Sequence, residues 1–569
     1  MSYCFGGIGM KKLIPVIIAL ILILIIGAAT AGTIVFDKYS YSKEKADLQE
    51  YFGVSGDKLA IVLQDEVISE KARLIDGTCY FDLNTVHKYF NDWFYADVNE
   101  MLLLYVLPET VDTVNMGTAA TAEDGSKNLA FVENGKIYVA VEHVQKFTNF
   151  SVDMYEGRVQ VYTQWGDKRV VTVEKDTEVR LKGGIKSPIL KEVAEGEELE
   201  VLEKMENWSK VKTQDAIIGY VENKRISEES IEKETPVTSY TEPEYTTHQM
   251  EGKVCLGWHS IGGVGGNSTL ESTVVNAKSM NVIAPTWFSL CDNEGNYESF
   301  GTADYVQRAH NMGLEVWGVL DDFNYNNVHD AGISVLEVLS STAKRTHLIN
   351  NIVQEAVALG LDGINLDFER VTQDCGEHFA QFVKELSVQC RLNSLTFSID
   401  SYVPFNFNEY LRRDVQGKVA DYVIIMGYDE HWHGSGDPGS VASLNYVSNG
   451  IDKTLESVPK EKVINALPFY SILWKTEGAK VTDEYLTMNN TQDFLDRIGR
   501  EGVWDEETQQ LYVEWTSGNT KYQLWAETED SIMVKLNVMR AKEIAGVAVW
   551  RLGYGTPSVW EMISAYVNS

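Results

Sequence analysis

A chain of 569 residues is too long for one hydrophobic core, and at ~100–200 residues per domain three or four domains are expected. Its 44% apolar and 23% charged residues are ordinary for a globular protein. Acidic residues outnumber basic ones by 83 to 49, and the resulting formal net charge of −34 disfavours nucleic acid as a partner.

The first feature along the chain is an uncharged run over residues 13–36 that follows two lysines. A run of this length can cross a bilayer core of ~30 Å as a helix, and the lysines place the N-terminus inside. We therefore expect residues 1–36 to be a cytoplasmic tip and a transmembrane helix, in a single-pass cell-membrane protein whose bulk is extracytoplasmic. The alternative is a secreted protein with a cleaved signal peptide, because Ala29-Thr30-Ala31 is an A-x-A-like site.

Residues 43–168 alternate strand-like runs with short helical stretches. Two segments, 73–90 and 131–153, are loose copies of each other, each with a polar Gly turn, a short strand and an amphipathic helix. The pair resembles the duplicated domain named after the copper amine oxidase N-terminus, which implies a small α+β stalk domain.

Residues 170–228 predict a small all-β barrel of five short strands, because apolar and polar residues alternate between turn signals. Trp208 and the Gly219-Tyr220-Val221 run make this stretch similar to a bacterial SH3-like module. A wall-binding role and a role as a spacer are both open. Residues 229–248 contain few large aliphatic side chains and many charges, so we expect an extended, mobile linker there.

The large C-terminal part, residues 249–569, alternates eight apolar runs with helical stretches. Runs this apolar are typical of strands buried on both faces of a parallel sheet. Eight such units in about 320 residues favour a (β/α)8 TIM barrel. The apolar runs are 253–260, 282–290, 314–323, 361–369, 395–403, 421–431, 463–471 and 546–555.

The overall fold class is therefore α/β, with the barrel preceded by the α+β and SH3-like domains. The interval 471–543 is long enough for an insertion between the last two strands. A doubly wound open sheet is the alternative, but the chain lacks the glycine fingerprint of a phosphate-binding loop.

Polar residues alternate with apolar ones in the fourth run, Asp362-Gly363-Ile364-Asn365-Leu366-Asp367-Phe368-Glu369. A helical stretch precedes it and can end in a left-handed cap at Gly360. Because alternate residues of a strand share a face, Asn365, Asp367 and Glu369 point one way. Polar side chains inside a barrel are costly unless they are paired or functional, so these three predict a site at the C-terminal rim.

This run resembles the DxxDxDxE motif of glycoside hydrolase family 18, the chitinases and related N-acetylglucosaminidases. The chain has DxxNxDxE, which is similar to the spore-cortex and peptidoglycan-active branch. The run Met426-Gly427-Tyr428-Asp429 and Trp550 resemble further family motifs. Asn365 departs from the family pattern, since it cannot titrate and can only hold Asp367 by hydrogen bonds.

The resemblance implies a retaining glycosidase with substrate-assisted catalysis. Glu369 would donate the proton, Asp367 would orient the substrate's acetamido group, and Tyr428 would bind its carbonyl oxygen. Substrate-binding roles would fall to Asn365, Asp429 and, as the hydrophobic floor, Trp550. Neither a metal ion nor an organic cofactor is expected.

We expect a monomer that cleaves β-1,4-linked N-acetylglucosamine polymers, with peptidoglycan ahead of chitin. The alternative is a non-catalytic cell-wall carbohydrate-binding protein that uses the same groove. A membrane partner, through the N-terminal helix, is part of the same expectation. Tyr402, Trp258, Trp287 and Trp317 lie at or near strand ends, and each could stack on a sugar or belong to the core.

Overall fold

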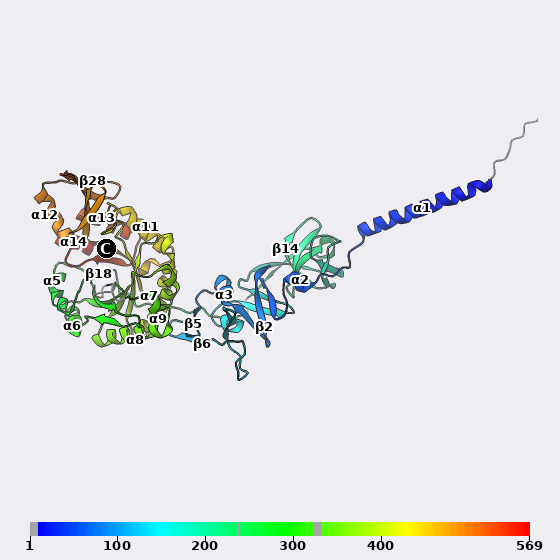
Figure 1. Cartoon of the computed structure of the whole chain (residues 1–569), viewed down its shortest axis with the longest axis horizontal. Helices are drawn as coiled ribbons and strands as arrows, with labels where there is room; N and C mark the ends of the chain where they lie inside the picture. Colours follow the sequence, from blue (N-terminus) through cyan, green and yellow to red (C-terminus); the bar gives the residue numbers. More distant parts are fainter. Residues whose placement is uncertain (1–9, 236–237, 324–331) are drawn as a thin grey trace, which may run out of the picture. The chain divides into compact units, whose positions relative to one another are not determined.

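The computed structural model of the chain describes residues 10–235, 238–323 and 332–569 (Figure 1). The chain divides into two compact units. The first consists of Met1–Asp92 and Met116–Glu242, and the second consists of Trp93–Asn115 and Pro243–Ser569. Each unit is described by itself below.

The expected transmembrane helix over residues 13–36 is wrong. Helix α1 (Met10–Tyr39) occupies this region and contains Pro15. A membrane span needs about 20 predominantly apolar residues in one helix. Within the described part of the chain, no helix combines that length with that apolar character. The cytoplasmic tip expected at 1–9 lies outside the described residues.

The first half of unit 1 is a mixed sheet covered by short helices. Its strand order is β7-β8-β3-β2-β1-β10-β9, in which β1 and β10 run parallel and the other neighbours antiparallel. The strands are β1 (Lys58–Leu63), β2 (Glu66–Ile75), β3 (Thr78–Asp82), β7 (Ala130–Glu133), β8 (Lys136–Ala140), β9 (Ser151–Tyr155) and β10 (Arg158–Tyr162). The helices are α2 (Leu48–Phe52), α3 (Leu83–Tyr89) and α4 (Val141–Gln145).

The second half of unit 1 is an antiparallel all-β module with strand order β13-β12-β16-β15-β14-β11-β17. Its strands are β11 (Asp167–Thr172), β12 (Thr177–Arg180), β13 (Ile189–Val193), β14 (Glu198–Lys204), β15 (Trp208–Thr213), β16 (Ile218–Glu222) and β17 (Ser230–Lys233). The module shares a core with the preceding sheet, because Ala60 and Val62 cluster with Leu190 and Ile217. This shared core explains why the two halves form one unit.

The segment expected to be a mobile linker, residues 229–248, is partly structured. Strand β17 pairs antiparallel with β11 in unit 1. At the other end, the backbone N–H of His248 donates to Asp421 Oδ1 at 2.7 Å within unit 2. The many charged side chains of this segment predicted mobility, but they gave no sign of the backbone hydrogen bonds that hold its two ends.

Unit 2 is built around a closed parallel barrel, as the eight apolar runs predicted. The strand order is β18-β31-β25-β24-β23-β22-β21-β19, and a β18–β19 pairing closes the ring. The barrel strands are β18 (Val254–His259), β19 (Val282–Leu290), β21 (Glu315–Asp321), β22 (Gly363–Asp367), β23 (Thr396–Tyr402), β24 (Tyr422–Met426), β25 (Val463–Pro468) and β31 (Gly546–Trp550). Strand β20 (Tyr297–Ser299) pairs antiparallel with β19 at its edge.

Helices surround this barrel and connect its strands (Figure 1). Helix α8 ends at Gly360, whose φ of +77° forms the predicted left-handed cap. The helices are α5 (Leu270–Val274), α6 (Ala303–Asn311), α7 (Val335–Leu339), α8 (Thr342–Leu359), α9 (Gly376–Leu392), α10 (Arg413–Val419), α11 (Leu444–Leu455), α13 (Glu529–Ala541) and α14 (Pro557–Val567).

An antiparallel sheet and helix α12 lie between β25 and the barrel helix α13, in the interval where the sequence indicated an insertion. The strand order is β27-β26-β30-β29-β28. These elements are β26 (Tyr470–Glu477), β27 (Lys480–Thr487), α12 (Met488–Ile498), β28 (Val503–Asp505), β29 (Gln510–Ser517) and β30 (Thr520–Ala526). They have their own core, to which Leu473, Leu495, Val513 and Leu524 contribute.

A three-stranded excursion from the stalk sequence, Trp93–Asn115, also belongs to unit 2. Its strands are β4 (Tyr95–Asp97), β5 (Leu102–Val106) and β6 (Val111–Asn115). The Arg345 guanidinium on α8 donates to Tyr95 Oη at 3.1 Å, and the backbone N–H of Thr342 donates to Asp97 Oδ2 at 2.8 Å. The sequence placed this segment with the stalk because such long-range polar contacts leave no local pattern.

Candidate active site

The strand β22 places its polar residues inside the barrel, as the alternation predicted. Asn365 is fully buried, and its Oδ1 accepts a hydrogen bond from Trp258 Nε1 at 2.9 Å. Its amide nitrogen donates to Ser398 Oγ at 3.0 Å and to Asp400 Oδ1 at 2.9 Å. Asn365 therefore ties β22 to β18 and β23 across the barrel interior.

Glu369 lies two residues beyond the end of β22, at the rim of the barrel. The hydroxyl of Tyr402, the last residue of β23, donates to Glu369 Oε2 at 2.7 Å. The backbone N–H groups of Glu369 and Arg370 donate to the two carboxylate oxygens of Asp322, at 2.9 and 3.0 Å. Asp322, just after β21, thus fixes the turn that carries Glu369.

The surroundings of Glu369 favour its protonated form. Burial is the main cause that raises its pKa above the ordinary value. The hydrogen bond from Tyr402 opposes this shift, whereas the negative charges of Asp429 and Asp321 add to it. A raised pKa makes a carboxyl group better suited to act as a general acid.

A pair of buried carboxyl groups lies next to Glu369. Burial, together with the charges of Asp400, Glu369, Asp321 and Asp322, raises the pKa of Asp367 well above its usual range. Burial likewise raises the pKa of Asp400, which the hydrogen bond from Asn365 lowers in part. Asp367 Oδ1 is buried without a hydrogen-bond partner in the described structure, so it is available to a ligand.

A groove of about 910 Å³ opens beside Glu369. Its wall is rich in aromatic side chains, and several of them are exposed. Phe407 is 75% exposed and Trp432 is 57% exposed, which leaves flat apolar faces available for stacking against a sugar ring. Residues that line the groove include Glu369, Tyr402, Phe405, Tyr428, Asp429 and Trp432.

Two further predicted site residues, Tyr428 and Asp429, follow β24 and line the same groove. Tyr428 is buried, whereas Asp429 is exposed at the groove surface and accepts a hydrogen bond from the Tyr470 hydroxyl. The backbone of Asp429 adopts a φ of +60°, the left-handed region that costs energy for a residue with a side chain. The structure therefore brings Glu369, Tyr428 and Asp429 together.

Trp550 ends β31 and is not among the described residues that line this groove. Its ring meets that of Trp258 edge to face, with centroids 5.9 Å apart. Trp258 in turn donates a hydrogen bond to Asn365, so Trp550 is linked to Asn365 through Trp258. Trp258, Trp287 and Trp317 are almost fully buried and belong to the core rather than to an exposed sugar-stacking surface.

Sequence reasoning missed three acidic or phenolic partners of Glu369. It left Tyr402 open between stacking on a sugar and belonging to the core, whereas the Tyr402 hydroxyl donates a hydrogen bond to Glu369 Oε2. It overlooked Asp400 and Asp322 altogether. A usable signal existed, because Ser398, Asp400 and Tyr402 alternate along the fifth apolar run as the polar residues do along the fourth.

Two stretches of the chain match known families. Residues 293–555 match "Glycosyl hydrolases family 18", and residues 175–227 match "Bacterial SH3 domain". The first match covers the rim and groove described above, and the second covers most of the antiparallel module of unit 1. Both fall on the regions that the sequence motifs had singled out.

Curated relatives align mainly with the barrel. The "Uncharacterized glycosylase YvbX" of Bacillus subtilis (strain 168) is 25% identical over 297 residues, which cover 50% of this chain and 84% of that protein. The "Cortical fragment-lytic enzyme" of Bacillus anthracis is 25% identical over 243 residues, 40% of this chain. The chain spans only 54% of that enzyme's length.

A solved structure shares the barrel fold. The chitinase from Chromobacterium violaceum ATCC 12472 superposes with a TM-score of 0.50 at 21% sequence identity. The superposition covers 56% of this chain and 99% of the chitinase. At this level of identity the likeness concerns the fold alone, and it agrees with the closed parallel barrel of unit 2.

Proposed function

Because the chain belongs, over residues 293–555, to glycosyl hydrolases family 18, we propose that it is a retaining glycosidase with Glu369 as its catalytic acid. One observation carries this assignment. Glu369 lines an aromatic groove at the rim of the barrel, and burial raises its pKa above the ordinary value, which favours the protonated form. A purely binding groove has no need of a proton donor in this position.

In the proposed reaction, Glu369 donates its proton to the glycosidic oxygen as the bond from that oxygen to the anomeric carbon breaks. The carbonyl oxygen of the substrate's own acetamido group attacks the anomeric carbon and forms a cyclic oxazolinium ion. The Glu369 carboxylate then takes a proton from water, which attacks the same carbon and reopens the ring. Two displacements at one carbon give net retention.

Asp367 and Tyr428 are proposed to act on the acetamido group. A buried carboxyl oxygen without a partner, such as Asp367 Oδ1, can accept a hydrogen bond from the acetamido N–H. The positive charge that develops on the ring favours the ionised form of Asp367, which then balances that charge. The Tyr428 hydroxyl would donate to the acetamido oxygen. Asn365, which is itself held by Trp258 and Asp400, would keep β22 in register beneath Asp367.

We propose polymers of β-1,4-linked N-acetylglucosamine as substrates, with peptidoglycan ahead of chitin. Similarity to the cortical fragment-lytic enzyme of Bacillus anthracis supports the first choice, and the shared fold with a chitinase is compatible with the second. Both polymers are extracytoplasmic, so the enzyme would act outside the cytoplasm. In this setting, the bacterial SH3 domain at 175–227 would bind the cell wall.

Incubating the full chain with purified peptidoglycan and with chitin oligomers, and identifying the products by mass, tests the proposal. Glu369→Gln keeps the size and hydrogen bonding of the side chain but cannot donate the proton. Since general acid catalysis contributes about 10²–10⁴-fold, its turnover should fall by that factor while sugar binding survives. Binding without products from the wild-type chain would instead identify a carbohydrate-binding protein.

A further inference from the structure

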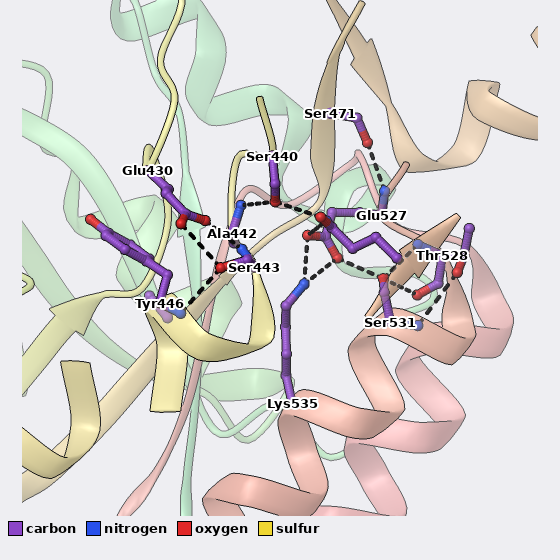
Figure 2. Close-up of polar contacts among 12 residues, drawn as sticks. Glu430, Ser440, Ala442, Ser443, Tyr446, Ser471, Glu527, Thr528, Ser531 and Lys535 are labelled. Carbon is purple, nitrogen blue, oxygen red and sulfur yellow. Dashed lines mark hydrogen bonds and ion pairs between the residues drawn. The ribbon is translucent and has the colours of Figure 1, made fainter. Parts of the chain in front are cut away.

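A buried ion pair joins the insertion to the barrel in unit 2 (Figure 2). Glu527 directly follows β30 of the inserted sheet, and Lys535 lies on the barrel helix α13. Both side chains are 0% exposed, and the Lys535 ammonium donates to the two Glu527 carboxylate oxygens at 2.6 and 2.7 Å. Such a pair is costly to desolvate and is often no more stable than apolar side chains of the same volume.

The remaining hydrogen-bonding capacity of this pair is also used. Gln510 Nε2 donates to Glu527 Oε1 at 2.6 Å, and Ser531 Oγ donates to Glu527 Oε2 at 2.7 Å. The backbone N–H of Glu527 donates to Ser471 Oγ at 2.8 Å. A fully bonded network of this kind fixes the geometry of every group attached to it.

One branch of the network leads to the loop of residues 429–443, which leaves β24 and lines the groove. The Ser440 hydroxyl donates to Gln510 Oε1, and it accepts from the backbone N–H of Ala442 at 3.0 Å. The inserted sheet holds the same loop at a second point, because Trp474 Nε1 donates to the carbonyl oxygen of Gly439 at 2.8 Å.

The first residues of this loop, Asp429 and Glu430, line the groove. Glu430 accepts from the backbone N–H of Ser443 at 2.8 Å and from its hydroxyl at 3.1 Å, which closes the loop on itself (Figure 2). The preceding residue, Asp429, has the strained φ of +60°. A strained conformation persists only where its surroundings determine it, and here they include the loop closure and the Tyr470 contact.

From these contacts we infer that Glu527 and Lys535 are positioning residues for the groove. Through Gln510 and Ser440, the ion pair anchors the 429–443 loop to the inserted sheet and so holds Asp429 against the substrate. The expected changes in kcat/KM rest on the proposed function. The anchoring of the loop does not, because it can be measured without catalysis.

Two serines that bind opposite sides of the network provide a matched test in the full chain. Ser440→Ala removes the hydroxyl that links the network to the loop, whereas Ser531→Ala removes a hydroxyl from the side away from the loop. Both serines are buried. Ser440→Ala loses the hydrogen bonds of the hydroxyl with Gln510 and Ala442, and Ser531→Ala loses those with Glu527 and Thr528. Ser440→Thr restores the hydroxyl and serves as the conservative rescue.

We expect Ser440→Ala to lower kcat/KM on chitin oligomers about tenfold, because small misplacements of site residues are expensive. Ser531→Ala should keep the wild-type kcat/KM although its melting temperature falls, and Ser440→Thr should recover most of the rate. Equal kcat/KM for Ser440→Ala and Ser531→Ala would overturn the inference.

Hydrogen exchange separates this inference from the proposed function. Ser440→Ala should speed exchange of the loop amides, including those of Glu430 and Ser443, while Ser531→Ala should leave them unchanged. If the wild-type chain hydrolyses nothing, the proposed function fails but the exchange comparison still decides whether the network anchors the loop. Unchanged exchange in Ser440→Ala contradicts the anchoring.

Discussion

Two buried clusters of ionisable side chains in the barrel unit differ in whether a cation lies beside the carboxyl groups. One cluster belongs to the proposed catalytic site, and the other holds the inserted sheet on the barrel. At the rim, Asp367, Asp400 and Glu369 are packed with further carboxyl groups, and burial and mutual repulsion raise their pKa values. Beside the insertion, Glu527 is equally buried but has Lys535 as its counter-ion.

The comparison shows that burial of a carboxyl group has different consequences with and without a neighbouring cation. Without a cation, a buried carboxyl group lowers its electrostatic cost by keeping a proton, which it can then donate. With a cation and a complete set of hydrogen bonds, the charge of a buried carboxylate is compensated, and the group holds its neighbours in place. The predictions below test whether charge compensation is what separates the two clusters.

The largest effect on stability is expected when the Glu527–Lys535 pair loses its cation. Lys535→Met leaves the Glu527 carboxylate buried without a counter-ion, which should reduce the free energy of unfolding of unit 2 by about 3–5 kcal/mol. Urea denaturation followed by tryptophan fluorescence measures this change. The double variant Glu527→Gln/Lys535→Met removes both charges and should recover most of the loss. A double variant as unstable as the single one would show that charge compensation is not the reason for the pair.

A smaller effect is expected at the rim, where Asp322 is buried beneath Glu369. Burial raises the pKa of Asp322 to about 7, although the two backbone N–H groups that it binds act in the other direction. A carboxyl group whose pKa is higher in the folded chain stabilises the fold most below its unfolded pKa, about 3.9. This contribution, up to about 4 kcal/mol, is lost as pH rises through about 7.

Asp322→Asn removes that titration. Stability of the wild-type chain should therefore fall between pH 4 and pH 8 more steeply than that of Asp322→Asn, as measured by melting temperature across this range. Parallel pH curves for the two proteins would contradict the raised pKa of Asp322. Activity should also fall, because the amide cannot accept from both backbone N–H groups at the turn that carries Glu369.

The smallest effect concerns the charge of Asp429. Its negative charge is a secondary cause of the raised pKa of Glu369, after burial, and its exposure to solvent weakens the interaction. Because the acid must be protonated, activity is lost as pH rises through the pKa of Glu369. Asp429→Asn should shift the alkaline limb of the kcat/KM profile to lower pH by less than about one unit. A shift to higher pH would contradict the assignment.

The sequence was most informative where a local pattern dictates structure. The eight apolar runs predicted the barrel strands, and alternation predicted that Asn365 and Asp367 point into the barrel. Gly360 marked the end of α8 because glycine adopts the left-handed cap conformation without the steric cost of a Cβ atom. In each case the residues of one short segment are enough to predict its local structure.

What the sequence could not reveal depends on partners that are distant in the chain. Tyr402 binds Glu369 and Lys535 binds Glu527 only after folding, and neither pair has a distinctive spacing. The anchor at residues 13–36 was inferred from an uncharged run that follows two lysines, and the structure corrected it because no described helix has the apolar length of a membrane span. The excursion Trp93–Asn115 joined unit 2 through side-chain contacts that local periodicity does not encode.

The central claim is that Glu369 donates the proton while the substrate's acetamido group, oriented by Asp367, attacks the anomeric carbon. The most direct test compares Glu369→Gln and Asp367→Asn on an aryl N-acetylglucosaminide whose leaving group needs little protonation. Glu369→Gln should recover much of the wild-type rate on this substrate, and Asp367→Asn should not, because cyclisation is still required. Equal recovery of both variants, or equally fast wild-type cleavage of a glycoside that lacks the N-acetyl group, would contradict the account.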